Sequence, residues 1–353
     1  MNPPGTLLYN ATAYEQCKKA YDYNANGWIV AVFSNVALLD CTGTLLTLHV
    51  FRILCFSQVE VFHINLRILF FNLFAALLIR ALLTLYRAGD HLYLIINWKS
   101  KCDFIQNSNW CDLQSTLTSA PVMTLVYTFF AISLERGVAT IHYKKYEKRR
   151  DICIVLLICL ATWVHPFYMV LRSIFDTIGV TPTEKLYCSS MTSKNINMLS
   201  SFAVPIILLV ATTVVLFFVL RFCHKWQRLT LKTQKHTLSG RFQLNENIRA
   251  SKLVLPIAFL FIIMTLLNIV FLFIMKYTMG EKDVKLFGIL KEATSLNFPI
   301  FMNLSGVIFI FKCPALAKRT WIIRNYNRFI GDPLPEEIQG ANQHFSVLGN
   351  YWK

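Results

Sequence analysis

The sequence predicts an all-α membrane protein, a bundle of seven transmembrane helices with its N-terminus outside the cell and its C-terminus inside. Apolar residues make up 55% of the 353 residues and charged residues only 15%, whereas a soluble domain is about 45–50% apolar and about 25% charged. A helix needs about 20 apolar residues to cross the hydrocarbon core, and the chain contains seven such runs. The runs are continuous rather than alternating, which argues against a porin-like barrel.

The segments between the runs hold the turn residues and most of the charge, which a bilayer would otherwise have to desolvate. Residues 1–27 are polar, show no signal-peptide pattern and are predicted to form an extracellular N-terminus. Residues 28–311 form the predicted bundle, and residues 312–353 a cytoplasmic tail in which Ala315–Arg328 is a short amphipathic helix lying on the membrane. The predicted spans are Trp28–Phe51, His63–Tyr86, Leu113–Ala139, Ile152–Phe175, Asn197–Phe222, Leu253–Met275 and Leu286–Phe311.

Lysine and arginine are distributed unequally between the segments that flank these spans. The odd-numbered gaps and the tail hold 22 of them, against 11 in the N-terminal segment and the even-numbered gaps. Because basic loops are retained in the cytoplasm, this count sets the predicted orientation. An N-glycosylation acceptor, Asn10-Ala-Thr12, lies in the segment placed outside. The net charge of +16 is then mainly cytoplasmic, where it attracts anionic membrane lipid, and nucleic acid is not needed to explain it.

Four of the ten cysteines fall in the segments placed outside, and this even number faces an oxidising compartment. Cys111 lies at the outer mouth of span three and Cys188 in the loop before span five, so a bridge between them would pin that loop over the bundle. Cys17 would then pair with Cys102 or stay free.

Enzymatic chemistry has no support in the sequence. It contains no HExxH, GxSxG, P-loop or paired Cys-x-x-Cys pattern, and its histidines are dispersed. We therefore expect no catalytic residue, cofactor or metal. Cys223 and Cys313 lie at the inner membrane boundary, where each either carries an acyl chain or stays unmodified.

Charges inside spans are informative, because each costs a few kcal/mol unless it is paired or hydrated. Arg80 in span two and Glu292 in span seven lie at similar depth, so they either pair or offer a polar floor to a ligand cavity. With Lys291 the three groups sum to +1, which favours a neutral or anionic ligand. If Arg80 instead pairs with Glu292 and Lys291 snorkels to the surface, the pocket is apolar and suits volatile or lipid-like compounds.

Polar side chains and prolines also mark the middle of the bundle. Four residues at compatible depths are predicted to form a polar cluster between spans one, two and seven: Asn35, Asp40, Asn72 and Asn303. Prolines inside the spans remove helical hydrogen bonds and are expected to kink them. They are Pro121, Pro166, Pro205, Pro256 and Pro299.

The inner end of span three resembles that of G-protein-coupled receptors. The string Ile132–Thr140 contains the acidic residue and arginine, Glu135 and Arg136, that end this span in such receptors, and Cys111 stands 25 residues before the arginine. More closely, the chain resembles nematode serpentine chemoreceptors of the alpha/beta class over all seven spans. The strings that carry this resemblance are Cys102-Asp103, Cys111–Pro121, Leu134–Thr140, Tyr143–Lys148 and Arg241–Arg249, the last including Phe242-Gln-Leu-Asn-Glu-Asn247.

The sequence departs from rhodopsin-like receptors at three places. Gly137 follows the arginine where many receptors carry an aromatic residue, span seven reads Asn297-Phe-Pro-Ile-Phe301 without the usual tyrosine, and Pro256 lies near the inner end of span six. The activation switches of those receptors are therefore not transferred as a whole.

The resemblance implies a chemosensory receptor in the plasma membrane of sensory cells, which binds a small molecule and signals to a heterotrimeric G protein. It implies a ligand pocket in the outer half, coupling through Glu135 and Arg136, and a cytoplasmic motif. The pocket candidates are Arg80, Met123, Thr124, Tyr127, Phe271, Lys291 and Glu292, and the motif residues are Phe242, Gln243, Glu246 and Asn247.

Two other classes of seven-span protein compete with the receptor. A ligand-gated channel subunit of the gustatory or odorant type usually has its N-terminus inside, which the distribution of basic residues opposes. A transporter would show short, glycine-interrupted spans in matching halves, and none are evident. Assembly into homo- or hetero-oligomers is left open.

Overall fold

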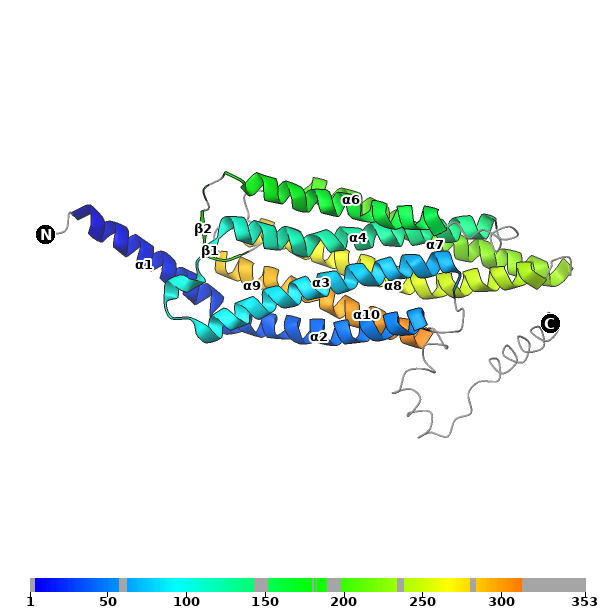
Figure 1. Cartoon of the computed structure of the whole chain (residues 1–353), viewed down its shortest axis with the longest axis horizontal. Helices are drawn as coiled ribbons and strands as arrows, with labels where there is room; N and C mark the ends of the chain where they lie inside the picture. Colours follow the sequence, from blue (N-terminus) through cyan, green and yellow to red (C-terminus); the bar gives the residue numbers. More distant parts are fainter. Residues whose placement is uncertain are drawn as a thin grey trace, which may run out of the picture.

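The chain folds into an elongated bundle of long helices (Figure 1), and seven helical segments are long and apolar enough to cross a membrane. The predicted fold class, an all-helical protein with seven spans, is thus confirmed. The computed structural model describes residues 4–56, 62–142, 152–179, 181, 183–188, 198–233, 238–279 and 284–312. The predicted tail helix Ala315–Arg328 lies outside these residues.

The elements follow one another along the chain with short connections. One end of the bundle carries α1 and the two-residue strands β1 and β2, and α1 projects beyond it (Figure 1). The helices are α1 Pro4–Asn24, α2 Gly27–Phe56, α3 Ile64–Asn97, α4 Ser108–Ile141, α6 Ile152–Thr177, α7 Met198–Thr233, α8 Leu238–Met279, α9 Val284–Thr294 and α10 Asn297–Lys312. A 3-10 turn, η1, spans Lys101–Phe104, and the strands are β1 Gln106–Asn107 and β2 Glu184–Lys185.

Several helices extend beyond the apolar runs that predicted them. The N-terminal segment forms α1, α3 continues for about three turns past Tyr86, and α7 and α8 reach into the stretch 221–252 that was predicted to be a loop. Hydropathy measures the part of a helix that lies in hydrocarbon, and polar residues outside the hydrocarbon continue the same helix. The helix ends were therefore misplaced where the residues are polar.

Span seven was predicted as one helix but consists of two, α9 and α10. Ser295 and Leu296 separate them, and their amides donate to the carbonyls of Glu292 and Ala293, each three residues earlier. Pro299 follows and has no N–H for the carbonyl of Ser295, so regular α-helical bonding does not continue through this stretch. The described helices α4, α6, α7 and α8 continue through their internal prolines.

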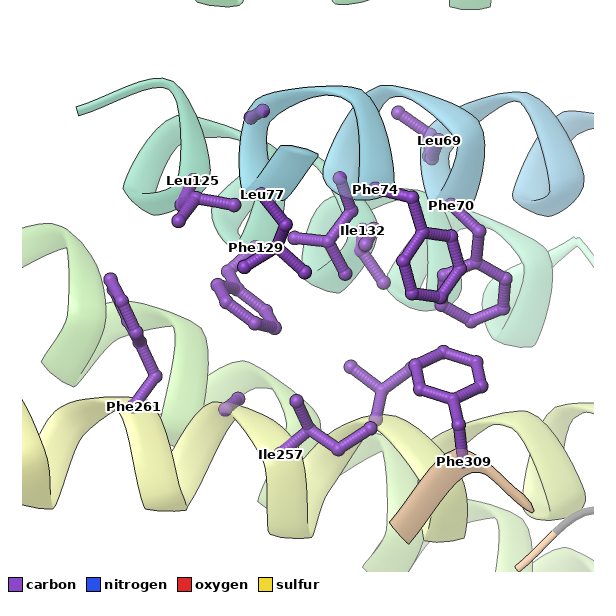
Figure 2. Packing of buried hydrophobic residues seen from close by; sticks show 14 of the residues in the cluster. Leu69, Phe70, Phe74, Leu77, Leu125, Phe129, Ile132, Ile257, Phe261 and Phe309 are labelled. Carbon is purple, nitrogen blue, oxygen red and sulfur yellow. The ribbon is translucent and has the colours of Figure 1, made fainter. Parts of the chain in front are cut away.

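The apolar core lies where α3 and α4 face α8 and α10. In Figure 2, side chains from α3 and α4 point toward Ile257 and Phe261 of α8 and Phe309 of α10. Phe309 packs edge-on against Phe70 and Phe74, with ring centroids 5.2 and 5.1 Å away. Such edge-to-face pairs add about 0.5–1.5 kcal/mol each beyond the area they bury. This cluster holds together helices that are distant in the sequence.

A polar junction links α3, α4 and α6 beside this core. The side-chain amide of Asn72 donates to Thr128 Oγ1 at 2.8 Å and to Thr162 Oγ1 at 3.0 Å, and its carbonyl oxygen accepts from Trp163 Nε1 at 2.8 Å. Asn72 therefore joins three spans through three hydrogen bonds.

The polar cluster predicted between spans one, two and seven does not form as expected, because Asn72 faces α4 and α6 instead. Asn303 donates to the carbonyl of Leu39 and so joins α10 to α2, whereas Asn35 bonds to Ala31 within its own helix. Similar depth in the membrane was not enough to predict contact, because the rotation of each helix about its axis decides which side chains meet.

Replacing Asn72 with Leu should destabilise the bundle, because the substitution leaves Trp163 and two buried threonines without their shared partner. Interhelical hydrogen bonds in membranes contribute about 0.6 kcal/mol on average and up to about 1.7. We therefore expect a loss of roughly 1–3 kcal/mol, measured as reversible unfolding in mixed micelles. Asn35→Leu is the matched control, since Asn35 is exposed and its side chain bonds to Ala31 of its own helix. Equal stability of the two variants would contradict the role of the junction.

Candidate functional site

Two disulfides gather four chain segments at one end of the bundle, which we call the disulfide end. Cys17 of α1 is bonded to Cys102 of η1, and Cys111 of α4 to Cys188, which follows β2. The antiparallel pairing of β1 with β2 brings Gln106 opposite Lys185 and adds to the second bridge. Of the two states open to Cys17, the structure contains the bridged one.

A polar hollow lies beneath these segments, among α1, α2, α3, α4, α9 and the segment after β2. It measures about 370 Å³ including its open mouth, but the space for the centres of water molecules is only about 20 Å³. That space suits about one or two waters. Its walls include the side chains of Tyr23, Phe33, Arg87, His91, Tyr187 and Glu292.

Arg87 is the charged centre of the hollow. One of its terminal nitrogens, Nη2, donates to Glu292 Oε1 at 2.7 Å and to the carbonyl of Cys188 at 3.1 Å, and its guanidinium lies over the ring of Phe33. Lys291 also donates to Glu292 Oε1, at 3.2 Å. Through Arg87, the helix α3 is joined to α2, to α9 and to the segment that the Cys111–Cys188 bridge holds.

Arg87 was missed in the sequence because its stretch, Arg87–Asp90, was assigned to a loop. A signal was present: Arg80, Thr84, Arg87 and His91 recur at the spacing of one helical face. The same assignment explains why Arg80 was considered as a partner of Glu292, the first of the two alternatives for this pair of residues. Arg80 lies about two turns deeper, where it donates to the carbonyl of Thr118, and Lys291 is buried beside Glu292 rather than extended to the surface.

The other predicted pocket residues do not line this hollow; of that set, only Glu292 does. Tyr127 bonds through its hydroxyl to His165 of α6 at 3.1 Å, and Phe271 is exposed on α8. Thr124 is fully buried, and Met123 is half-buried on α4. Whether these four side chains contact a ligand stays a prediction.

At the opposite end of the bundle, Arg136 is fully buried and makes contacts that we call the arginine clamp. Its guanidinium donates to Glu135 Oε2 at 2.5 Å and Oε1 at 2.6 Å, and to Asn247 Oδ1 of α8 at 2.9 Å. The residue before Asn247, Glu246, accepts from the backbone N–H of His63 at 2.6 Å. Two adjacent residues of the predicted motif thus tie α8 to α4 and to the start of α3.

For several of the remaining predicted residues, the side chain lies outside the part that the structure describes. Phe242 and Gln243 belong to α8, but their side chains lie outside the described part, as does that of Asn10 in α1. Cys223 is buried and lies 3.7 Å from the hydroxyl oxygen of Thr140. It does not face lipid here. Cys313 lies outside the described residues.

The seven-span helical bundle, with bridged segments at one end and a buried arginine at the other, agrees with the class of G-protein-coupled receptors that the sequence resembles. The model of the family described as serpentine seven-transmembrane receptor class ab chemoreceptor matches residues 14–320. The chain belongs to this family of chemoreceptors, whose members are receptors and not enzymes. The predicted resemblance to the alpha/beta class of nematode receptors is confirmed.

Two relatives from Caenorhabditis elegans are similar to the chain. Serpentine receptor class alpha/beta-14 is 24% identical over 373 aligned positions, which cover 96% of this chain and 93% of that receptor. A probable G-protein coupled receptor is 24% identical over 262 positions, which cover 70% of this chain and 68% of its own length.

Arg87→Met should destabilise the disulfide end strongly, because it leaves the buried Glu292 with only Lys291 beside it. Removing one partner of a buried ion pair costs about 3–5 kcal/mol. The expected result is a large drop in the melting temperature of the detergent-solubilised protein. Arg172→Met is the control, since its pair with Asp176 is 67% and 69% exposed and such pairs contribute about 0–1 kcal/mol. A similar melting temperature for both variants would show that Arg87 does not organise this end.

Proposed function

We propose that the protein is a chemosensory receptor that binds a small molecule from its disulfide end and signals through its clamp end to a heterotrimeric G protein. In this proposal the disulfide end is extracellular and the clamp end cytoplasmic, in the plasma membrane of sensory cells. The excess of basic residues in the odd-numbered gaps and the tail supports this orientation, as do disulfides confined to the α1 end among the described residues. Family membership favours the receptor over the channel and transporter alternatives.

The observation that carries the coupling proposal is the contact between Arg136 and Asn247. It holds the cytoplasmic end of α8 against α4, because the amide lies on one helix and the guanidinium on the other. In this proposal the clamp belongs to the resting packing. A ligand that binds a second packing more tightly shifts the population toward that packing. The size of the shift is set by the difference between the ligand's affinities for the two packings. Release of Asn247 then lets the ends of α7 and α8 part from α4.

The groups at this end suit a G protein that inserts a helix between the parted spans. When Asn247 leaves, Arg136 retains Glu135 and gains free donor positions for carbonyls at a helix C-terminus, which attract cations. Basic residues of the stretch 221–252, among them Arg249 and Lys252, provide a positive surface around this point. The sequence of events is therefore ligand binding, loss of the clamp, and docking.

Asn247→Ala should raise ligand-independent signalling, because it removes a hydrogen bond to a charged group that only the resting packing contains. Such bonds contribute about 1.5–3 kcal/mol, so basal guanine-nucleotide exchange on added heterotrimeric G protein should rise severalfold in membranes of equal receptor content. Arg136→Ala should instead give no more exchange than membranes without receptor, at unchanged surface delivery.

Asn268→Ala is the matched control, because Asn268 lies on the same helix about six turns from the clamp. It should leave basal exchange at the level of the unaltered receptor. Basal exchange that is the same for Asn247→Ala and Asn268→Ala, or that survives in Arg136→Ala, would refute the coupling role.

A further inference from the structure

Two polar groups on the walls of the hollow are buried without a hydrogen-bond partner in the described part of the chain. They are the second carboxylate oxygen of Glu292, Oε2, and the hydroxyl of Tyr23, which belong to residues that are only 2% and 7% exposed. A buried polar group without a partner costs about 1–3 kcal/mol. Tyr23 and Glu292 both line the hollow, so one bound molecule could satisfy the two groups together.

The charges around Glu292 restrict what that molecule can be. The bare oxygen Oε2 can only accept, so an anionic head group has no proton to give it. The other oxygen already holds two cations, Arg87 and Lys291, so an ammonium group would enter beside two like charges that share one carboxylate. A neutral donor avoids both penalties.

Size and shape restrict it further. The hollow has room for about one or two waters, which suits a small head group such as a hydroxyl. The ring of Tyr23 lies against Gly288 so closely that a Cβ at this position would overlap the phenolic oxygen. Tyr187 packs against Tyr23 with the two rings tilted by 36° and their centroids 4.5 Å apart, and Phe33 also lines the hollow.

We propose that the hollow binds a neutral small molecule bearing a hydroxyl group, an alcohol or a phenol. Its hydroxyl donates to Glu292 Oε2 and accepts from the hydroxyl of Tyr23, and its apolar body lies toward the mouth against Phe33 and Tyr187. The inference rests on the proposed ligand-binding function. It places the ligand among α1, α2, α3 and α9, where Glu292 is the one member of the predicted pocket set that lines the hollow.

The protonation state of Tyr23 agrees with this geometry. Burial raises the pKa of the Tyr23 phenol above its ordinary value, and the negative charge of Glu292 raises it further. The phenol therefore keeps its proton and is a hydrogen-bond donor at neutral pH.

The test is the melting temperature of the full-length detergent-solubilised receptor, titrated with benzyl alcohol, benzylamine and benzoate as probes of one shape and three charges. A ligand that binds the folded state raises the melting temperature. Benzyl alcohol should raise it in a saturable way, and the other two should not. Tyr23→Phe should raise the half-saturating concentration of benzyl alcohol about two- to tenfold, which is the effect of losing one neutral hydrogen bond.

Tyr23→Phe should fold normally, because the lost hydroxyl has no partner among the residues that the structure describes. Tyr14→Phe is the matched control, since Tyr14 is on the same helix, 61% exposed and outside the hollow, and it should bind like the unaltered receptor. Equal benzyl alcohol titrations for both variants, no saturable shift, or an equal shift with benzylamine or benzoate would overturn the proposal. The assay contains no G protein, so failed coupling and a failed binding site give different results.

Discussion

A polar group buried inside the packed bundle has no water to bond to, and most of the contacts that shape this protein follow from that constraint. Arg136 is fully buried and engages Asn247, which is 111 positions away. Arg87 engages Glu292 across 205 positions, and Asn72 bonds to Trp163 across 91. Each of these polar side chains fixes how a helix is rotated toward a neighbour, a choice that the apolar surfaces alone leave open.

Hydropathy was enough to predict the spans, because the cost of placing charge in hydrocarbon is large and falls on every residue of a span. It was not enough to predict where helices end, since polar continuations such as Arg87–Asp90 and the start of α8 stay helical outside the hydrocarbon. The contacts between polar side chains of different helices were harder to predict than the helix ends. Arg80 and Arg87 are separated by about two turns, and only the length and rotation of α3 decide which of them meets Glu292.

Helix α3 makes polar contacts at three levels along the bundle. Arg87 lies at the hollow, Asn72 at the junction with α4 and α6, and the backbone of His63 at the contact with Glu246. Between these points its apolar side chains pack against Phe309 and its neighbours (Figure 2). The two ends of the molecule are thus connected by one continuous helix, which gives events at the hollow a direct physical route to the clamp.

Because α8 is long, a small bend within it produces a large displacement at its N-terminal end. Pro256 removes one helical hydrogen bond, which makes the helix most easily bent there. The arm from Pro256 to Leu238 is about 27 Å long, and Asn247 lies halfway along it. A bend of about 10° moves the tip by about 5 Å and Asn247 by about 2 Å. Its bond to Arg136 is 2.9 Å long, so a rotation of this size is wide enough to break it.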